Sequence, residues 1–110
     1  PSVIDMTCEL PRRGPAERYL CLATWDGTAP SDADLRCGAR FAAEERAAGR
    51  SVLVHCSHGR GRCTTMLIAA LIQAGESEDV GSALRLIQAA RPACRLNGAQ
   101  RRALERFSAR

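Results

Sequence analysis

A cysteine and an arginine stand six positions apart in the segment His55-Cys56-Ser57-His58-Gly59-Arg60-Gly61-Arg62. The apolar run Val52-Leu53-Val54 precedes this segment, and a long apolar stretch follows it. A strand that leads through a glycine-containing loop into a helix N-terminus binds anions, because backbone N–H groups and the helix dipole point at the loop. A cysteine at the start of such a loop adds a nucleophile, so the segment predicts a site that can attack the anion it binds.

Hydrolysis of a phosphate monoester is the chemistry that these residue types suit, and it needs a large stabilisation of the transition state. Cys56 can act as a thiolate nucleophile, because a helix N-terminus and a nearby arginine favour the ionised form. Arg62 can grip two phosphoryl oxygens at once. The rest of the phosphate loop is predicted to be Ser57, His58, Gly59, Arg60 and Gly61, whose backbone N–H groups can point inward, with the two glycines allowing the tight backbone.

The reaction also needs an acid that protonates the leaving group from a different loop. Asp26 fits this role, because it lies in the turn-rich stretch from Trp25 to Pro30. Asp32 and Asp34 are alternatives, although both fit the first turn of a helix, where a carboxylate interacts favourably with the helix dipole.

The elements that must position these residues are predicted from hydrophobic patterns and turn signals. Strands are predicted at Val3–Met6, Tyr19–Leu22 and Ser51–Cys56, and helices from Ser31 to Gly49, over Arg62–Ala74, from about Ser77 to Pro92, and from Asn97 onward. The unbroken Val-Leu-Val of the third strand predicts burial on both faces. The order predicts a single α/β domain over residues 1–110, with a mainly parallel central sheet flanked by helices and a ligand site at the strands' carboxyl ends.

The motif His55-Cys56-x-x-Gly59-x-x-Arg62 resembles the signature of the cysteine-dependent phosphatases, in particular their dual-specificity branch. The resemblance extends to Asp26, 30 residues before Cys56, and to the segment from Arg91-Pro92 to Gln100. It implies a phosphomonoester hydrolase with a phosphocysteine intermediate and no metal or cofactor. Proteins phosphorylated on tyrosine, serine or threonine are the implied substrates, and phosphoinositides or other lipid phosphates are the alternative. His55 is implied to be buried and to hold the loop by hydrogen bonds.

Two departures from that family stand out. The family usually has one or two further strands upstream, so the chain, which starts just before its first predicted strand, is expected to lack them at its N-terminus. The family also usually has Ser or Thr directly after the loop arginine, where this chain has Cys63. A thiol is the weaker hydrogen-bond donor, and Thr64 lies one residue too late to substitute. Two hypotheses follow: Cys63 slows breakdown of the phosphocysteine, or it forms a reversible disulfide with Cys56. The alternative is that a small residue is tolerated at this position without a role.

The amino-acid composition indicates which classes of partner the protein can bind. The formal net charge is +4, every one of the 16 cationic side chains is arginine, and aromatic residues make up 4%. Arginine suits phosphate, whereas so modest a charge with so few stacking platforms does not indicate nucleic acid. We therefore expect a phosphorylated protein or a phospholipid head group as partner. His58 and Arg60 are expected to face outward, where they either contact an acidic substrate or are solvated. Nothing in the sequence fixes an oligomeric state.

The chain has no run of about 18 apolar residues that would cross a membrane and no signal-peptide pattern at its start. Its six cysteines are not spaced as in a disulfide framework. Cys21 and Cys37 are expected to be small, at least half-buried hydrophobes, which indicates a reducing, intracellular and cytoplasmic setting.

Three other functions use some of the same residues. A zinc site could be drawn from His55, Cys56, His58 and Cys63, but the first two would point to opposite faces of a strand. A rhodanese-type sulfur carrier also places a cysteine before an anion-binding loop, yet it needs neither Asp26 nor Arg62. A phosphate-binding pseudoenzyme would keep the loop without turnover, and Cys63 is the feature that favours it.

Overall fold

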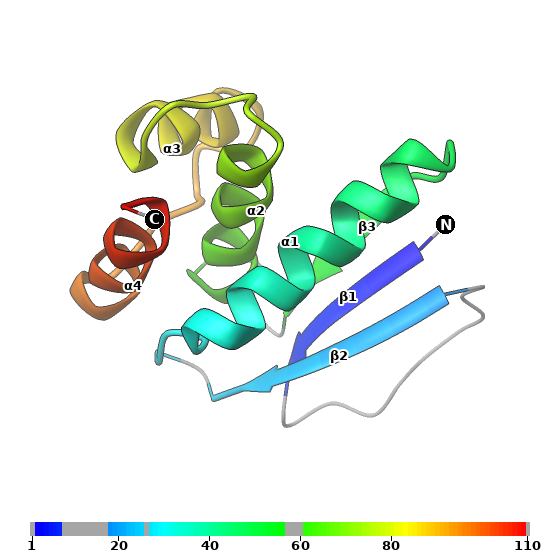
Figure 1. Cartoon of the computed structure of the whole chain (residues 1–110). Coiled ribbons are helices and arrows are strands. Elements are labelled where there is room, and N and C mark those ends of the chain that lie inside the picture. The colour runs from blue at the N-terminus through cyan, green and yellow to red at the C-terminus, as the bar shows by residue number, and fades with distance from the viewer. Residues whose placement is uncertain (1, 8–17, 26, 57–60, 110) are drawn as a thin grey trace.

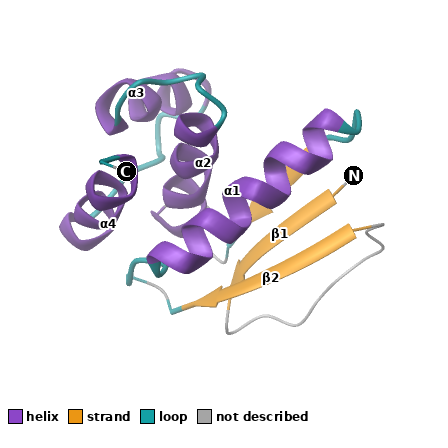
Figure 2. Cartoon of the chain, viewed as in Figure 1, coloured by secondary structure: helices purple, strands orange, loops and turns teal. Residues whose placement is uncertain are grey.

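The computed structural model describes residues 2–7, 18–25, 27–56 and 61–109 of the chain. The described elements are, in order, β1 (Ser2–Thr7), β2 (Arg18–Thr24), α1 (Asp32–Ala47), β3 (Val52–His55), α2 (Gly61–Gln73), α3 (Val80–Ala90) and α4 (Gly98–Ser108). The strands form a parallel sheet in the order β2-β1-β3 (Figure 1). Helices lie beside this small sheet and make up most of the rest of the described chain (Figure 2). The predicted α/β class with a parallel sheet is therefore confirmed.

The bounds of α1 follow from its capping residues. The Ser31 hydroxyl oxygen accepts a hydrogen bond from the Asp34 backbone N–H at 3.1 Å, which satisfies one of the free donors of the first turn. Gly49 takes a φ of +82° just beyond the other end, a conformation that glycine adopts without a steric penalty. Both ends agree with the helix that the sequence predicts.

The third helix starts later than predicted. The sequence predicts a start at about Ser77, whereas α3 begins at Val80. The Asp79 carboxylate determines this start, because it accepts a hydrogen bond from the Ser82 N–H at 2.7 Å and so caps the helix.

The core lies between the sheet and the helices. α1 and α2 pack against each other over one face of the sheet, and α3 and α4 pack on α2 (Figure 1). Apolar side chains with almost no exposed surface fill this space: Ile4, Met6, Leu22, Leu35, Ala39, Met66, Ile68, Leu104 and Phe107. α1 and α2 approach so closely that a Cβ at Gly38 would lie 2.5 Å from the Met66 sulfur. This contact holds α2, and with it Arg62, in a fixed place relative to the sheet.

Two predictions about burial are wrong. β3 is not buried on both faces, because Leu53 is 57% exposed. Side chains alternate along a strand, and Val52 and Val54 pack against the buried core whereas Leu53 does not. Cys21 lies on the same face of the sheet as Leu53, and Cys37 lies on the outer side of α1, so both cysteines are exposed rather than buried.

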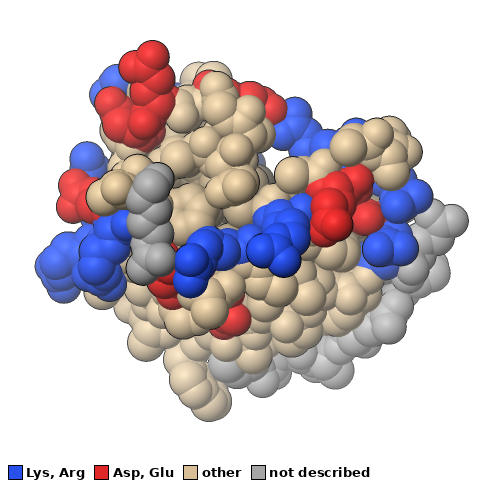
Figure 3. Space-filling view, viewed as in Figure 1, with Lys and Arg blue, Asp and Glu red and all other residues tan. Residues whose placement is uncertain are grey.

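Charges of both signs lie next to one another on the surface where α1 runs (Figure 3). Arg36 pairs with Asp32 at 3.2 Å, and Arg46 pairs with Glu76 at 2.6 Å. This face therefore does not carry a field of one sign. None of the helices in the described part of the chain is both long and apolar enough to cross a membrane.

A buried carboxylate joins the end of α1 to the start of the sheet. Glu45 is 2% exposed, and it accepts hydrogen bonds from the Ser2 hydroxyl at 2.5 Å and the Arg50 Nε at 2.8 Å. The Arg18 Nε lies 2.9 Å from its other oxygen. The hydrogen bonds from Arg50 and Ser2, together with the charge of Arg18, lower the pKa of Glu45 to about 2.

Replacing Glu45 with glutamine should change how stability depends on pH. A lowered pKa in the folded state stabilises the protein above the ordinary pKa of 4.5, and this contribution is lost as the pH falls from about 4.5 to about 2. Urea unfolding at several pH values should therefore show that Glu45→Gln loses less stability across this window than the unsubstituted chain. Parallel profiles for the two proteins would show that Glu45 is not the responsible group.

Candidate active site

The two cysteines of the predicted loop face each other at the carboxyl end of β3. Cys56 follows β3 directly and is half-buried, and Cys63 lies in the first turn of α2 and is 6% exposed. Their Sγ atoms are 3.0 Å apart, and the Cys63 Sγ is also 3.5 Å from the Val54 carbonyl oxygen. The contact with Cys56 and burial raise the pKa of the Cys63 thiol. Cys63 is therefore protonated and placed to donate its S–H to the Cys56 sulfur.

Arg62 is held inside the protein next to this pair. Its side chain is 1% exposed, and its Nη1 donates a hydrogen bond to the Thr24 carbonyl oxygen at 2.7 Å. Thr24 ends β2 and stands two residues before Asp26 in the chain. Arg62 thus links the start of α2 to the carboxyl end of β2, and its positive charge lies at the helix end that favours anions.

Part of the predicted site lies outside the described residues. This holds for Asp26 and for four residues of the phosphate loop, Ser57, His58, Gly59 and Arg60. Their roles remain predictions from the sequence. The residues on either side of Asp26 are described: the Trp25 carbonyl oxygen accepts hydrogen bonds from the Thr28 N–H at 3.0 Å and from the Thr28 hydroxyl at 2.6 Å.

The two alternative acids lie where the sequence suggests. Asp32 and Asp34 both belong to the first turn of α1. The N–H of Asp34 donates to Ser31, and Asp32 forms an ion pair with Arg36 one turn later. Their positions suit stabilisation of the helix.

His55 interacts with a carboxylate that the sequence reasoning missed. His55 is half-buried, with 37% of its side chain exposed, so the prediction of a fully buried histidine is not met. The reason is that His55, like Leu53, points to the face that α1 and α2 leave uncovered. Its Nε2 lies 3.5 Å from the Oδ1 of Asp5, which stands on the neighbouring strand.

Asp5 is almost fully buried and has several donors. The backbone N–H and hydroxyl of Thr7 donate to its Oδ1 at 2.9 and 2.6 Å, and the Tyr19 hydroxyl donates to its Oδ2. Burial raises the pKa of Asp5, but the hydrogen bonds from Thr7 and Tyr19 and the charge of His55 outweigh it, so the pKa lies below its ordinary value. An ionised Asp5 can therefore orient His55 directly before Cys56. The signal in the sequence is an aspartate within an apolar strand.

The sequence predicts the capping box at the start of α4, but not the contact that this box makes with α2. Asn97 and Gln100 form the predicted capping box, with each side chain accepting from the other's backbone N–H. Gln100 is 2% exposed and lies against the start of α2, where a Cβ at Gly61 would be 2.6 Å from its Nε2. Gly61 does not have a positive φ. Glycine at this position therefore provides room for Gln100 and not, as predicted, an unusual backbone angle.

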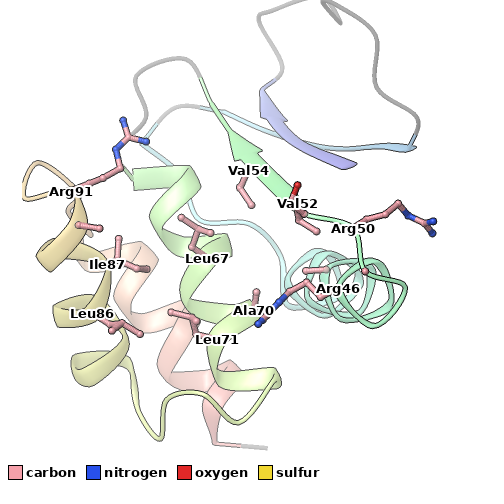
Figure 4. A pocket seen from close by; sticks show the side chains of 14 residues that line it. Arg46, Arg50, Val52, Val54, Leu67, Ala70, Leu71, Leu86, Ile87 and Arg91 are labelled. Atoms are coloured by element: carbon pink, nitrogen blue, oxygen red, sulfur yellow. The ribbon is translucent and has the colours of Figure 1, made fainter. Parts of the chain in front are cut away.

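An apolar groove of about 760 Å³ lies along β3, between this strand and the helices α2 and α3 (Figure 4). Val52 and Val54 of β3 face Leu67 and Leu71 of α2 and Ile87 of α3 across it. Arginines lie around its edge, namely Arg46, Arg50 and Arg91. Its lining includes neither Cys56 nor Arg62, so the groove is not the predicted reactive site. Nor do the described residues include a group of three or more side chains that could hold a metal ion.

The described residues thus bring together a thiol, a hydrogen-bond donor to that thiol, a buried guanidinium and a helix N-terminus. All four lie at the carboxyl ends of the parallel strands. This arrangement can bind an anion and attack it.

Comparisons with known proteins agree with this chemistry. The model of the family described as "Polymorphic toxin system, DSP-PTPase phosphatase" matches residues 7–76. The phosphatidylglycerophosphate phosphatase PTPMT2 of Arabidopsis thaliana is 35% identical over 80 residues, which are 73% of this chain and 35% of that protein. The phosphatidylglycerophosphatase and protein-tyrosine phosphatase 1 of Mus musculus is 47% identical over 55 residues, 49% of this chain and 28% of that protein. The chain therefore spans about a third of the length of these curated relatives.

A solved structure shows the same fold. PTPMT1 in complex with PI(5)P has a TM-score of 0.85 and 29% sequence identity, and the match covers 98% of this chain and 76% of that one.

Proposed function

The chain belongs to the DSP-PTPase phosphatase family of polymorphic toxin systems, and from that premise we propose that it hydrolyses phosphomonoesters through a phosphocysteine on Cys56. The Cys56 thiolate attacks phosphorus and the P–O bond to the leaving group breaks. Water then attacks the phosphocysteine, which releases inorganic phosphate and returns the thiolate. The observation that carries this proposal is the position of the Cys56 sulfur, 3.0 Å from the Cys63 sulfur and at the start of the helix that bears the buried Arg62.

Asp26 is the proposed acid that protonates the leaving oxygen and later accepts a proton from the attacking water. Two contacts of its described neighbours support it: Arg62 donates to the Thr24 carbonyl, and the Thr28 N–H donates to the Trp25 carbonyl. Asp26→Asn should lower kcat/KM, which reports the first step only, about a hundredfold on alkyl phosphates, which have poor leaving groups, and much less on aryl phosphates. Equal losses on both would assign the acid elsewhere.

A phospholipid head group is the substrate class that we favour. The names of both curated relatives describe phosphatidylglycerophosphate hydrolysis, and the solved relative was crystallised with a phosphoinositide. A phosphoprotein, which the sequence alone favours, is the second candidate, because one relative is also named a protein-tyrosine phosphatase. Both classes present the same phosphate monoester to Cys56 and Arg62 and differ in what surrounds it.

A substrate panel tests the proposal. Phosphate release would be measured with para-nitrophenyl phosphate, phosphatidylglycerophosphate in mixed micelles, and phosphotyrosine and phosphothreonine peptides, each with the unsubstituted protein and Cys56→Ser. We expect turnover of the aryl phosphate that Cys56→Ser abolishes, and faster turnover of the lipid than of either peptide. Equal rates in the two proteins would refute the phosphocysteine, and binding of phosphate without turnover would make the chain a pseudoenzyme.

Cys63→Ser should accelerate breakdown of the phosphocysteine. A hydroxyl at this position donates a stronger hydrogen bond to the departing Cys56 thiolate than a thiol does. A gain of about 1 kcal/mol in that bond corresponds to a roughly fivefold faster step. Single-turnover experiments that follow decay of the phosphoenzyme measure this step directly. Equal decay rates in the two proteins would show that the donor at position 63 does not matter.

A further inference from the structure

The start of α4 contacts the loop that carries the proposed acid. Asn97 uses both ends of its side-chain amide: Oδ1 accepts from the Gln100 N–H at 2.8 Å, and Nδ2 donates to the Gly27 carbonyl oxygen at 2.8 Å. The first bond caps α4. The second joins residues that are 70 positions apart, and helix capping does not require it. Gly27 directly follows Asp26 in the chain.

The other residue of the capping box also forms a hydrogen bond to this loop. The Gln100 Nε2 donates to the Thr28 carbonyl oxygen at 3.3 Å, and the side chain of Gln100 lies directly against Gly61 of the phosphate loop. On the other side of Asp26, Arg62 donates to the Thr24 carbonyl. The loop from Thr24 to Thr28 is thus tied to α2 before the aspartate and to α4 after it.

We propose that Asn97 is a positioning residue, whose amide group holds the Gly27 peptide so that Asp26 is set for proton transfer at the phosphate loop. This inference rests on the proposed role of Asp26. Proton transfer depends steeply on geometry, and a displacement of about 1 Å can cost about a hundredfold in rate. Gly27 is exposed, so water can replace the lost donor and the fold keeps its stability. The effect of Asn97 therefore falls on the chemical step.

The variant Asn97→Asp keeps the bond from the Gln100 N–H and removes the bond to the Gly27 carbonyl. An aspartate keeps the oxygen that accepts from Gln100 N–H and is favourable at a helix N-terminus. It has no donor for the Gly27 carbonyl. Asp79→Ala is the matched control, because Asp79 caps α3 in the same way and does not contact the loop from Thr24 to Thr28.

The readout is kcat/KM for phosphate esters with leaving groups of different basicity, because this ratio reports the step in which the leaving group departs and not hydrolysis of the phosphocysteine. We expect Asn97→Asp to lower kcat/KM about 10- to 100-fold on alkyl phosphates and less than about threefold on para-nitrophenyl phosphate, with Asp79→Ala unchanged on both. The double variant Asp26→Asn/Asn97→Asp should be no slower than Asp26→Asn alone, because a residue that acts through Asp26 has no effect once the acid is gone.

The outcomes also distinguish this inference from the proposed function. An unsubstituted protein without Cys56-dependent turnover would refute the proposed function. If that turnover is present and Asp26→Asn shows the leaving-group effect, an Asn97→Asp protein with wild-type rates would overturn the positioning role alone. Equal losses on alkyl and aryl esters, or additive losses in the double variant, would overturn it as well.

Discussion

Arg62→Lys should lower kcat/KM for aryl and lipid phosphates by about two to three orders of magnitude. The guanidinium offers two parallel N–H donors to a phosphoryl group, whereas an ammonium is a single point charge. Loss of one preorganised donor to a transition-state oxyanion typically costs about 10²–10³ in rate. The substitution also removes the bond from the Arg62 Nη1 to the Thr24 carbonyl at 2.7 Å, and so loosens the loop that precedes Asp26.

Steady-state kinetics of Arg62→Lys and of Arg101→Lys would measure this effect. Arg101 is an exposed residue of α4, paired with Glu105 one turn later, and its substitution should leave kcat/KM within about twofold. Melting temperatures of both variants would show whether the fold survives, because Arg62 is buried and its loss could also destabilise the chain. A well-folded Arg62→Lys protein that is as active as Arg101→Lys would show that the guanidinium does not bind the transferred phosphoryl group.

The sequence is enough to predict most of the fold because the local signals agree with one another. Ser31, Gly49 and Asn97 are each recognisable as cap residues, and each stands at a helix end in the structure. The apolar runs are long enough to distinguish strands from helices. Burial of individual side chains is less predictable, since Leu53 and Cys21 are apolar residues on a face of the sheet that the helices do not cover. Which face a layer of helices covers depends on packing between distant segments.

In the candidate site, too, the local features are predictable from the sequence and the long-range contacts are not. The spacing of Cys56, Arg62 and Cys63 is local, so the sequence predicts that they belong to one loop and one helix start. The contacts from Asp5 to His55 and from Asn97 to Gly27 join residues 50 and 70 positions apart. They depend on strand register and on how α4 packs against α2, which no local pattern encodes. Capping is a sufficient local reason for an asparagine at position 97, so its bond to Gly27 has no signal in the sequence. Asp5 within an apolar strand does signal a polar partner, but the sequence does not identify His55 as that partner.

Mild oxidation should abolish the proposed phosphatase activity completely and reversibly through a disulfide between Cys56 and Cys63. Peroxide oxidises the Cys56 thiolate to a sulfenic acid and is reduced to hydroxide. This removes the negative charge that helps to keep Cys63 protonated. The Cys63 sulfur then attacks the Cys56 sulfur, and the sulfenic oxygen leaves as water. The sulfur atoms start 3.0 Å apart, so they must approach by about 1 Å to reach the length of a disulfide bond.

The variant Cys63→Ser tests whether the disulfide protects Cys56 from irreversible oxidation. After treatment with one to a few equivalents of peroxide, the unsubstituted protein should show a 56–63 linkage by mass spectrometry and regain its activity with a thiol reductant. Cys63→Ser lacks the second sulfur, so its sulfenic acid should proceed to the sulfinic acid, and activity should not return. Cys37→Ser is the matched control, because Cys37 is exposed on α1 and should leave recovery unchanged. Equal recovery of the unsubstituted protein and Cys63→Ser would mean that the short distance between the two sulfurs serves phosphocysteine breakdown alone and gives no protection against oxidation.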